Sequence, residues 1–178
     1  MFQQQFILIV TVLIMSNLVL FDFSETRDWS GWKIENDVVM GGNSTSKLER
    51  SEEGNALFTG TVSLENNGGF ASMQYHFASK EVKGYKKAII RLKGDGKTYQ
   101  FRTKSNLRER ASYVYNFKTT GDWQTLEIPL KDMKPVYRGR NLDIPNFPAQ
   151  TMQEIRFMIG NKKAENFRLE IDKIVISE

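Results

Sequence analysis

Hydrophobic positions recur at every second residue along most of this chain. In residues 56–64 the alternate positions Ala56, Phe58, Val62 and Leu64 are apolar, with mainly polar side chains between them. This period of two is typical of a half-buried β-strand. The same pattern predicts strands in further segments, namely residues 18–23, 71–77, 99–104, 113–118, 123–128, 155–159 and 167–176. Residues 88–92 are apolar on both faces, as expected of a central strand.

Turn residues separate these strands. Asn66-Asn67-Gly68-Gly69 stands between residues 56–64 and 71–77, and Asn and Gly readily adopt the positive φ of tight turns. We therefore expect a hairpin there. Residues 130–151 hold three of the four prolines and show little period, so they predict a long loop with a short helical turn near residues 131–133.

The last strand changes phase after Ile171, which predicts a β-bulge near Asp172-Lys173. Residues 24–46 have no clear period and are expected to be mostly loop. Roughly nine or ten short strands with almost no helix predict an all-β fold, an antiparallel β-sandwich or jelly roll.

The N-terminal residues differ from the rest. Phe6 to Met15 is an apolar run interrupted only by Thr11, shorter than the about 20 residues of a membrane-spanning helix. It matches the apolar part of a secretory signal peptide, although no Lys or Arg precedes it. An uncleaved anchor and a buried strand remain open. We expect a signal-like or anchor segment in residues 1–16 and one domain in residues 17–178. The protein would be exported or envelope-associated with a signal segment, and otherwise membrane-anchored or cytoplasmic.

Composition narrows the chemistry. A chain of 178 residues with 40% hydrophobic residues suits one folded domain. The net charge is +4 and the basic residues are dispersed among acidic ones, which favours a mixed-sign surface over a nucleic-acid interface. The absence of cysteine excludes disulfides and thiolate sites, and the single histidine, His76, cannot build a multi-histidine metal site.

Residues 32–44 form the most distinctive stretch, because they have no strand period and combine an aromatic, an Asn-Asp pair and Gly-Gly. Polar loops held by a rigid scaffold often carry binding sites. Trp32, Asp37 and Met40 would then form one wall of a partner surface. The alternative is structural, with Asp37 capping backbone amides and Trp32 filling the end of the sandwich.

Three arginines are candidates for anion binding. Arg102 lies on the polar side of an alternating strand, and Arg138 and Arg140 lie in the long loop. Guanidinium groups bind carboxylates and phosphates with two parallel hydrogen bonds. If these arginines converge with Trp32 or Trp123, the concave face would hold an anion or a sugar stacked on an aromatic ring. Solvated or locally paired arginines are the alternative.

Catalysis has little support in the sequence. His76 has no nearby carboxylate in the sequence to orient it as a base, and no spacing selects a pair of catalytic carboxylates. The glycines near Asp95 lie between strands, so they indicate a turn rather than a phosphate loop. We expect a non-enzymatic domain without a cofactor or a catalytic metal. A structural calcium ion remains compatible with this type of fold.

Two motifs point to a family. Asp37-Val38-Val39-Met40-Gly41-Gly42 and Asn66-Asn67-Gly68-Gly69-Phe70, followed by Gly94-Asp95-Gly96 and Arg138-Gly139-Arg140, resemble the complex I intermediate-associated protein 30 family. The resemblance runs from about residue 18 to the C-terminus. It implies a galactose-binding-like β-sandwich and a binding or assembly role.

The resemblance also implies a partner. The mitochondrial member of the family resembles an assembly chaperone of NADH:ubiquinone oxidoreductase, so a protein partner, such as a respiratory-complex subunit, is expected. A carbohydrate-binding module of the cell envelope, with a glycan as its ligand, is the alternative. The candidate binding residues are Trp32, Asn36, Asp37, Met40, Asn66, Asn67, Arg102, Trp123, Arg138 and Arg140.

Overall fold

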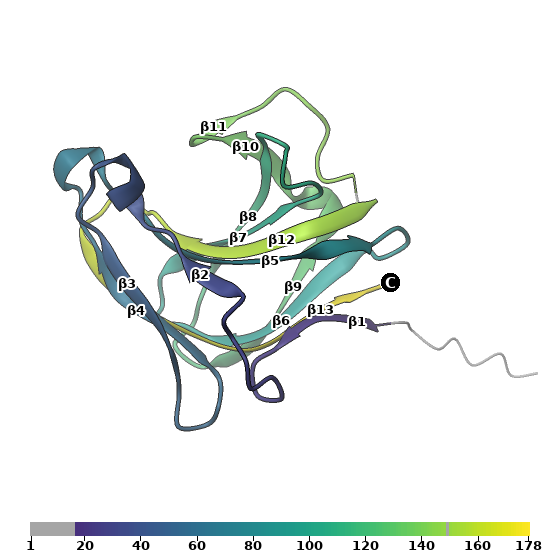
Figure 1. The fold of residues 1–178 in the computed structure, drawn as a ribbon, viewed down its shortest axis with the longest axis horizontal. Helices are drawn as coiled ribbons and strands as arrows, with labels where there is room; N and C mark the ends of the chain where they lie inside the picture. Colours follow the sequence, from purple (N-terminus) through teal and green to yellow (C-terminus); the bar gives the residue numbers. More distant parts are fainter. Residues whose placement is uncertain (1–16, 149) are drawn as a thin grey trace, which may run out of the picture.

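Two antiparallel β-sheets pack face to face in the computed structural model, which describes residues 17–148 and 150–178 (Figure 1). Sheet A has the order β3-β4-β13-β6-β9, with β1 also paired to β13, and sheet B has the order β11-β10-β8-β7-β12-β5-β2. The strands are β1 (Asn17–Asp22), β2 (Trp32–Ile34), β3 (Thr45–Arg50), β4 (Ala56–Val62), β5 (Ala71–Glu81), β6 (Lys87–Lys93), β7 (Thr98–Lys104), β8 (Ser112–Lys118), β9 (Trp123–Pro129), β10 (Lys134–Tyr137), β11 (Arg140–Asn141), β12 (Thr151–Ile159) and β13 (Glu165–Ser177). The predicted all-β sandwich is confirmed.

The core lies between the sheets because alternate residues of the long strands point inward. Ile90 and Leu92 on β6 and Phe101 and Phe157 on sheet B are fully buried. Each such side chain contributes about 1.5–3 kcal/mol by leaving water. The intervening residues face outward, and those of sheet B include many of the charged and amide side chains discussed below.

β13 is the centre of sheet A, and its register shifts between Ile171 and Lys173 where it pairs with β6. This confirms the predicted bulge. The two ends of β13 pair with different strands along one edge, β4 over residues 165–171 and β1 over residues 173–177. A single long strand therefore joins the beginning and the middle of the chain.

The predicted hairpin between β4 and β5 is wrong. β4 pairs with β3 and β13 in sheet A, whereas β5 pairs with β2 and β12 in sheet B. The connection contains the 3₁₀-helix η2 (Glu65–Asn67), in which Asn66 and Asn67 have φ of 53° and 62°. The positive φ expected of these Asn residues is therefore present, but the turn that they form carries the chain from sheet A to sheet B instead of closing a hairpin.

The two predicted loops contain more structure than expected. Residues 130–151 hold the 3₁₀-helix η3 (Leu130–Asp132), β10 and β11, and residues 24–46 hold β2, the 3₁₀-helix η1 (Asp37–Met40) and the start of β3. β2, β10 and β11 are only two to four residues long. Strands this short show no recognisable alternation, so only their pairing with longer neighbours reveals them.

An aromatic cluster fills the space beneath β2. Trp32 is 6% exposed and packs against Phe21, Phe23 and Tyr75 with ring centroids 5.0–5.5 Å apart. Its Nε1 has no hydrogen-bond partner among the described residues. This placement matches the structural alternative for Trp32, a filler of the sandwich interior.

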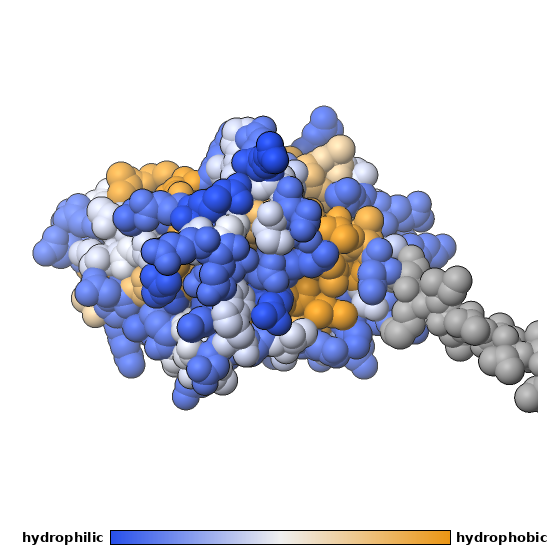
Figure 2. All heavy atoms as spheres, turned by 90° about the horizontal axis from the view of Figure 1, so that it is seen from below, coloured by the Kyte–Doolittle hydropathy of each residue, from blue (hydrophilic) through white to orange (hydrophobic). Residues whose placement is uncertain are grey.

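The predicted signal or anchor segment, residues 1–16, lies outside the described residues. In residues 17–148 and 150–178, no helix is both long and apolar enough to cross a membrane. Seen from below, the surface is mostly hydrophilic, with a hydrophobic patch near the point where the described chain begins (Figure 2). Val19, Val175 and Ile89 lie side by side across β1, β13 and β6.

Candidate functional site

A buried carboxylate holds the stretch that the sequence singled out. Asp37 is fully buried and accepts hydrogen bonds from the Ser44 amide (2.9 Å), the Ser44 hydroxyl (2.5 Å), the Gly69 amide (2.6 Å) and the Phe70 amide (3.2 Å). The Ser44 hydroxyl oxygen also accepts from the Ser63 amide at 2.9 Å. We call Asp37 with these donors the Asp37 clamp. It ties the loop after β2 to the loop between β4 and β5.

Hydrogen bonding dominates the pKa of Asp37. Burial alone would raise the pKa, but the donors from Ser44, Gly69 and Phe70 more than offset burial and hold it below its ordinary value. No ion pair of the described residues involves Asp37. The carboxylate of Asp37 is therefore stabilised by uncharged hydrogen-bond donors, which matches the backbone-capping role considered for Asp37.

The glycines of the two motifs serve the clamp in two ways. Gly41 and Gly69 have φ of 91° and 135°, which other residues rarely adopt. Gly42 and Gly68 lack a positive φ, but a Cβ at these positions would lie 2.5 Å from Asp37 Cγ and 2.6 Å from Asp37 Oδ2, respectively. Backbone conformation explains the first pair, whereas space for Asp37 explains the second.

The clamp presents an exposed apolar segment. Val38, Val39 and Met40 on η1 are 60%, 72% and 61% exposed, although they directly follow the fully buried Asp37. We call these three residues the apolar knob. Leu64, in the loop that the clamp joins to η1, is also exposed. The sequence pointed to Met40 but not to Val38 or Val39. In a strand, alternation of apolar and polar residues shows which side chains are exposed, but a 3₁₀ turn has no such alternation.

A second polar region covers the outer side of sheet B. The register aligns Gln74, Arg156, Arg102 and Val114 across β5, β12, β7 and β8. We call the outward side chains of this row, and of the rows directly on either side of it, the polar face. They are Ser72, Gln74, His76, Gln100, Arg102, Lys104, Ser112, Val114, Asn116, Glu154, Arg156 and Met158. β10 and β11 rise at one side of this face (Figure 1).

Arg156 organises one half of the polar face. Its Nη1 lies 2.8 Å from Glu35 Oε1, its Nε lies 3.1 Å from Glu154 Oε1, and it also donates to the side chain of Gln74. Burial acts to raise the pKa of Glu35, but the hydrogen bond and the charge of Arg156, the hydrogen bond from Gln74 and the nearby His76 together lower it below its ordinary value. Glu35 and Glu154 are therefore both engaged with Arg156.

His76 does have an orienting carboxylate, which corrects the expectation from sequence. His76 Nε2 lies 2.9 Å from Glu154 Oε2, because β5 and β12 place these residues opposite each other although they are 78 positions apart. Which residues face each other across two distant strands cannot be recognised from the sequence pattern. A carboxylate-bound imidazole can act as a base, but within the described residues no hydroxyl donates to His76, so a nucleophile is not positioned beside it.

Arg102 differs from its neighbour Arg156. Its Nη1 donates to Gln100 Oε1 (2.9 Å) and to Met158 Sδ (3.3 Å), both neutral acceptors. Among residues 17–148 and 150–178 it forms no ion pair. Burial and then the adjacent positive charge of Arg156 lower the pKa of Arg102 to about 10. The surroundings of Arg102 therefore disfavour its charged form.

The remaining predicted residues lie elsewhere. The Asn36 side chain accepts a hydrogen bond from the Ser46 hydroxyl (2.7 Å), and Asn66 and Asn67 are exposed in the turn of η2. Trp123 belongs to sheet A, where Arg91 stacks over its ring at 5.1 Å. Arg138 and Arg140 are exposed around the β10–β11 turn. The structure therefore brings neither tryptophan together with Arg102.

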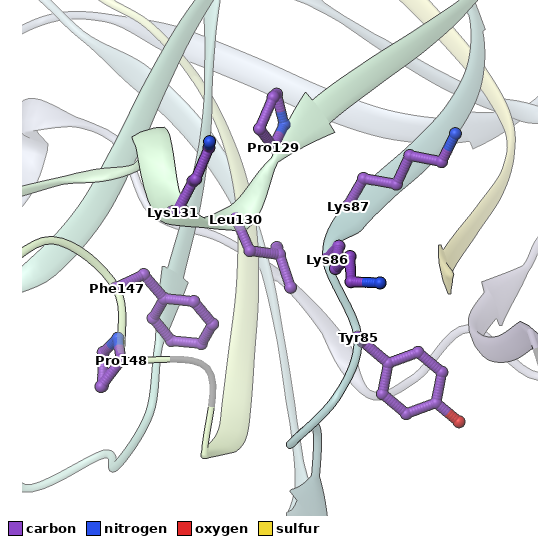
Figure 3. A pocket seen from close by; sticks show the side chains of 8 residues that line it. All are labelled: Tyr85, Lys86, Lys87, Pro129, Leu130, Lys131, Phe147 and Pro148. Atoms are coloured by element: carbon purple, nitrogen blue, oxygen red, sulfur yellow. The ribbon is translucent and has the colours of Figure 1, made fainter. Parts of the chain in front are cut away.

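Two hollows open outside the knob and the polar face. The larger, about 490 Å³, lies between the start of β6, the end of β9 and the loop before β12 (Figure 3). Its lining residues are Tyr85, Lys86, Lys87, Pro129, Leu130, Lys131, Phe147 and Pro148. The smaller, about 310 Å³, is polar and lies beside Asn161 and Glu165. The described residues contain no cluster of three or more His, Asp or Glu that could hold a metal ion.

Sequence comparison agrees with the motifs. The family model described as "Complex I intermediate-associated protein 30 (CIA30)" matches residues 21–171. An uncharacterized protein of Schizosaccharomyces pombe, C9E9.15, is 29% identical over 182 residues, covering 88% of this chain and 82% of the relative.

Similar solved structures share the fold. The family 11 carbohydrate-binding module of the cellulase Lic26A-Cel5E of Clostridium thermocellum has a TM-score of 0.64 at 18% identity, covering 90% of this chain and 94% of the module. The agarase AgWH50C has a TM-score of 0.61 at 12% identity, covering 91% of this chain and 24% of the enzyme. A CBM29-2 module variant has a TM-score of 0.55 at 11% identity over 92% and 85% of the two chains. Identities this low show a common β-sandwich and leave function to the site.

Proposed function

The chain belongs to the complex I intermediate-associated protein 30 family, and from that premise we propose that it is a non-enzymatic assembly domain that binds a protein partner through the apolar knob. The observation that carries the proposal is the exposure of Val38, Val39 and Met40, between 60% and 72%, on a turn fixed by the buried Asp37.

Rigidity makes this exposure informative. Each large apolar side chain gains about 1.5–3 kcal/mol when a partner removes it from water. Ordering a flexible loop would consume part of that gain, but the Asp37 clamp already fixes the backbone on both sides of the knob. Three adjacent exposed apolar side chains on a fixed turn therefore suit contact with an apolar protein surface better than contact with a sugar.

The family description supplies the first partner to test. It refers to association with intermediates of complex I, so subunits of respiratory NADH:ubiquinone oxidoreductase are the partners that we propose. The compartment is part of the same question. We propose that residues 1–16 direct or anchor the domain at a membrane, and the mature N-terminus of the captured protein reports whether they are removed.

Carbohydrate binding is the second candidate, supported by the similarity to carbohydrate-binding modules. Sugar rings usually stack on aromatic side chains, yet the twelve outward residues of the polar face include no aromatic. The rings of β5, β7 and β8, such as Phe101 and Phe117, point into the core instead. The glycan candidate is therefore the weaker one.

Affinity capture tests the proposal. A tagged full-length chain with a photo-reactive amino acid at position 39 is crosslinked in its native cells, and partners are identified by mass spectrometry. We expect complex I subunits, and their loss in a variant that combines Val38→Ser, Val39→Ser and Met40→Ser. The matched control combines Leu107→Ser and Ile144→Ser, two exposed apolar residues outside the knob, and should retain the partners.

Two results would reject this function. One is equal capture of the same subunits by the knob variant at an unchanged melting temperature, because contact with the knob would then be dispensable. The other is crosslinking of no respiratory subunit together with saturable binding to a neutral glycan, which would favour the carbohydrate module.

A further inference from the structure

The two arginines at the centre of the polar face are directly opposite each other in the register of β7 and β12. Arg156 is engaged by two carboxylates, Glu35 and Glu154. Among the residues that the structure describes, Arg102 donates only to the amide oxygen of Gln100 and the sulfur of Met158. A guanidinium carries five N–H donors, so most of the hydrogen-bonding capacity of Arg102 remains unused within the described chain.

The surroundings of Arg102 are positively charged. Lys104 follows on the same strand and donates to the backbone carbonyl of Glu109 at 2.6 Å, and Lys134 on β10 is exposed opposite Val114. Glu35 and Glu154 are already paired with Arg156, and the carboxylate of Glu109, in the loop after β7, accepts hydrogen bonds from the Ser105 hydroxyl. Arg102, Lys104 and Lys134 therefore offer positive charge that no ion pair with a described residue neutralises, which complements an acidic ligand.

We propose that the polar face binds a carboxylate of an acidic peptide segment, with the Arg102 guanidinium as its docking point. A carboxylate fits the planar fork of arginine with two parallel hydrogen bonds. A peptide fits better than an acidic glycan because no aromatic side chain of the four strands faces outward. The side-chain amides of Gln100 and Asn116, opposite each other on β7 and β8, can donate to and accept from peptide groups beside the carboxylate.

This site is distinct from the apolar knob and does not depend on the contact proposed there. The burial that lowers the pKa of Arg102 supports the same conclusion, because an incoming carboxylate would offset the unfavourable burial of the charge. In the free protein Arg102 is then a stability cost rather than a gain. Sites that sacrifice stability in this way are often functional.

The test uses the full-length protein and fluorescence anisotropy. The probe is a fluorescein-labelled glutamate-rich peptide, and the same peptide with glutamine in place of glutamate is the uncharged comparison. We expect binding of the glutamate peptide, weaker at higher salt, and an increase in Kd of about tenfold or more in Arg102→Met. The matched control is Arg168→Gln, an arginine on sheet A paired with Glu170, which should leave Kd unchanged.

Thermal melting separates binding from folding. Arg102→Met should melt at the same temperature as the parent chain or higher, because it removes a partly buried charge that forms no ion pair with a described residue. Arg102→Lys keeps the charge without the fork and should bind several-fold more weakly than the parent chain. The knob variant should bind the peptide normally, so failure here and failure of the knob proposal remain distinguishable.

Three outcomes would overturn the inference. The first is equal affinity of Arg102→Met and the parent chain for the glutamate peptide. The second is equal binding of the glutamine peptide. The third is tight binding of oligogalacturonate with no measurable binding of the glutamate peptide, which would identify an acidic glycan as the ligand.

Discussion

Asp37 and Arg102 are both charged side chains that form no ion pair within residues 17–148 and 150–178, but their surroundings differ. The two oxygens of Asp37 accept four hydrogen bonds, and the residue is fully buried. Arg102 donates to two neutral acceptors and has donors left over. The hydrogen bonds of the protein stabilise the charge of Asp37, whereas those of Arg102 leave part of its hydrogen-bonding capacity unused.

The difference separates a structural charge from a candidate binding charge. Burial acts against both charged forms. At Asp37 the hydrogen bonds more than compensate, and the pKa falls below its ordinary value, which favours the ionised state. At Arg102 the pKa also falls, to about 10, but for a base this disfavours the ionised state. Unused hydrogen-bonding capacity, rather than burial alone, marks the second site.

Removal of the Asp37 carboxylate should have the largest effect. Asp37→Ala leaves four donors of the clamp without an acceptor, so we expect the free energy of unfolding to fall by about 4 kcal/mol. Urea denaturation measures the change. Asp143→Asn, at an exposed position, is the control and should alter stability little. A loss below about 1 kcal/mol for Asp37→Ala would show that water replaces the carboxylate and that the clamp is not structural.

The paired arginine should behave as the opposite of Arg102. Arg156→Met leaves the nearly fully buried Glu154 with only His76 as its partner, and we expect a loss of about 3 kcal/mol. Arg102→Met, which strands no carboxylate, should be neutral or stabilising. Both variants are compared by urea denaturation at the same pH. Equal destabilisation by the two substitutions would remove the distinction between the paired and the unpaired arginine.

The smallest predicted effect is the acid dependence of the clamp. Because the folded-state pKa of Asp37 is lowered, its contribution is fully present above the ordinary carboxyl pKa and is lost as pH falls through the lowered value. The difference in unfolding free energy between the parent chain and Asp37→Asn should therefore shrink in acid. Denaturation series between neutral pH and about pH 3 measure it. A difference that stays constant over this range would contradict a lowered pKa.

The sequence located part of the candidate site through local chemistry. Asp37, Met40 and the four glycines were identifiable because motifs of Asn, Asp and Gly mark fixed turns. Arg102 was identifiable because it lies on the polar side of an alternating strand. Glu35, His76, Glu154 and Arg156 could not be recognised as a network, since their contacts join the residue after β2 to β5 and β12 across up to 121 positions of sequence.

Alternation of apolar and polar residues determined the all-β fold, the long strands and the bulge in β13. It also determined which side of each long strand its side chains lie on. All of these properties depend on the period of two within each strand. The choice of strand partners was decided only by the tertiary structure. β4 and β5 flank a well-formed turn and yet lie in different sheets, where β4 pairs with the distant β13 and β5 with the distant β12. Whether a charge is satisfied was decided there too, since Arg102 and Arg156 differ only in the residues that the paired strands bring beside them.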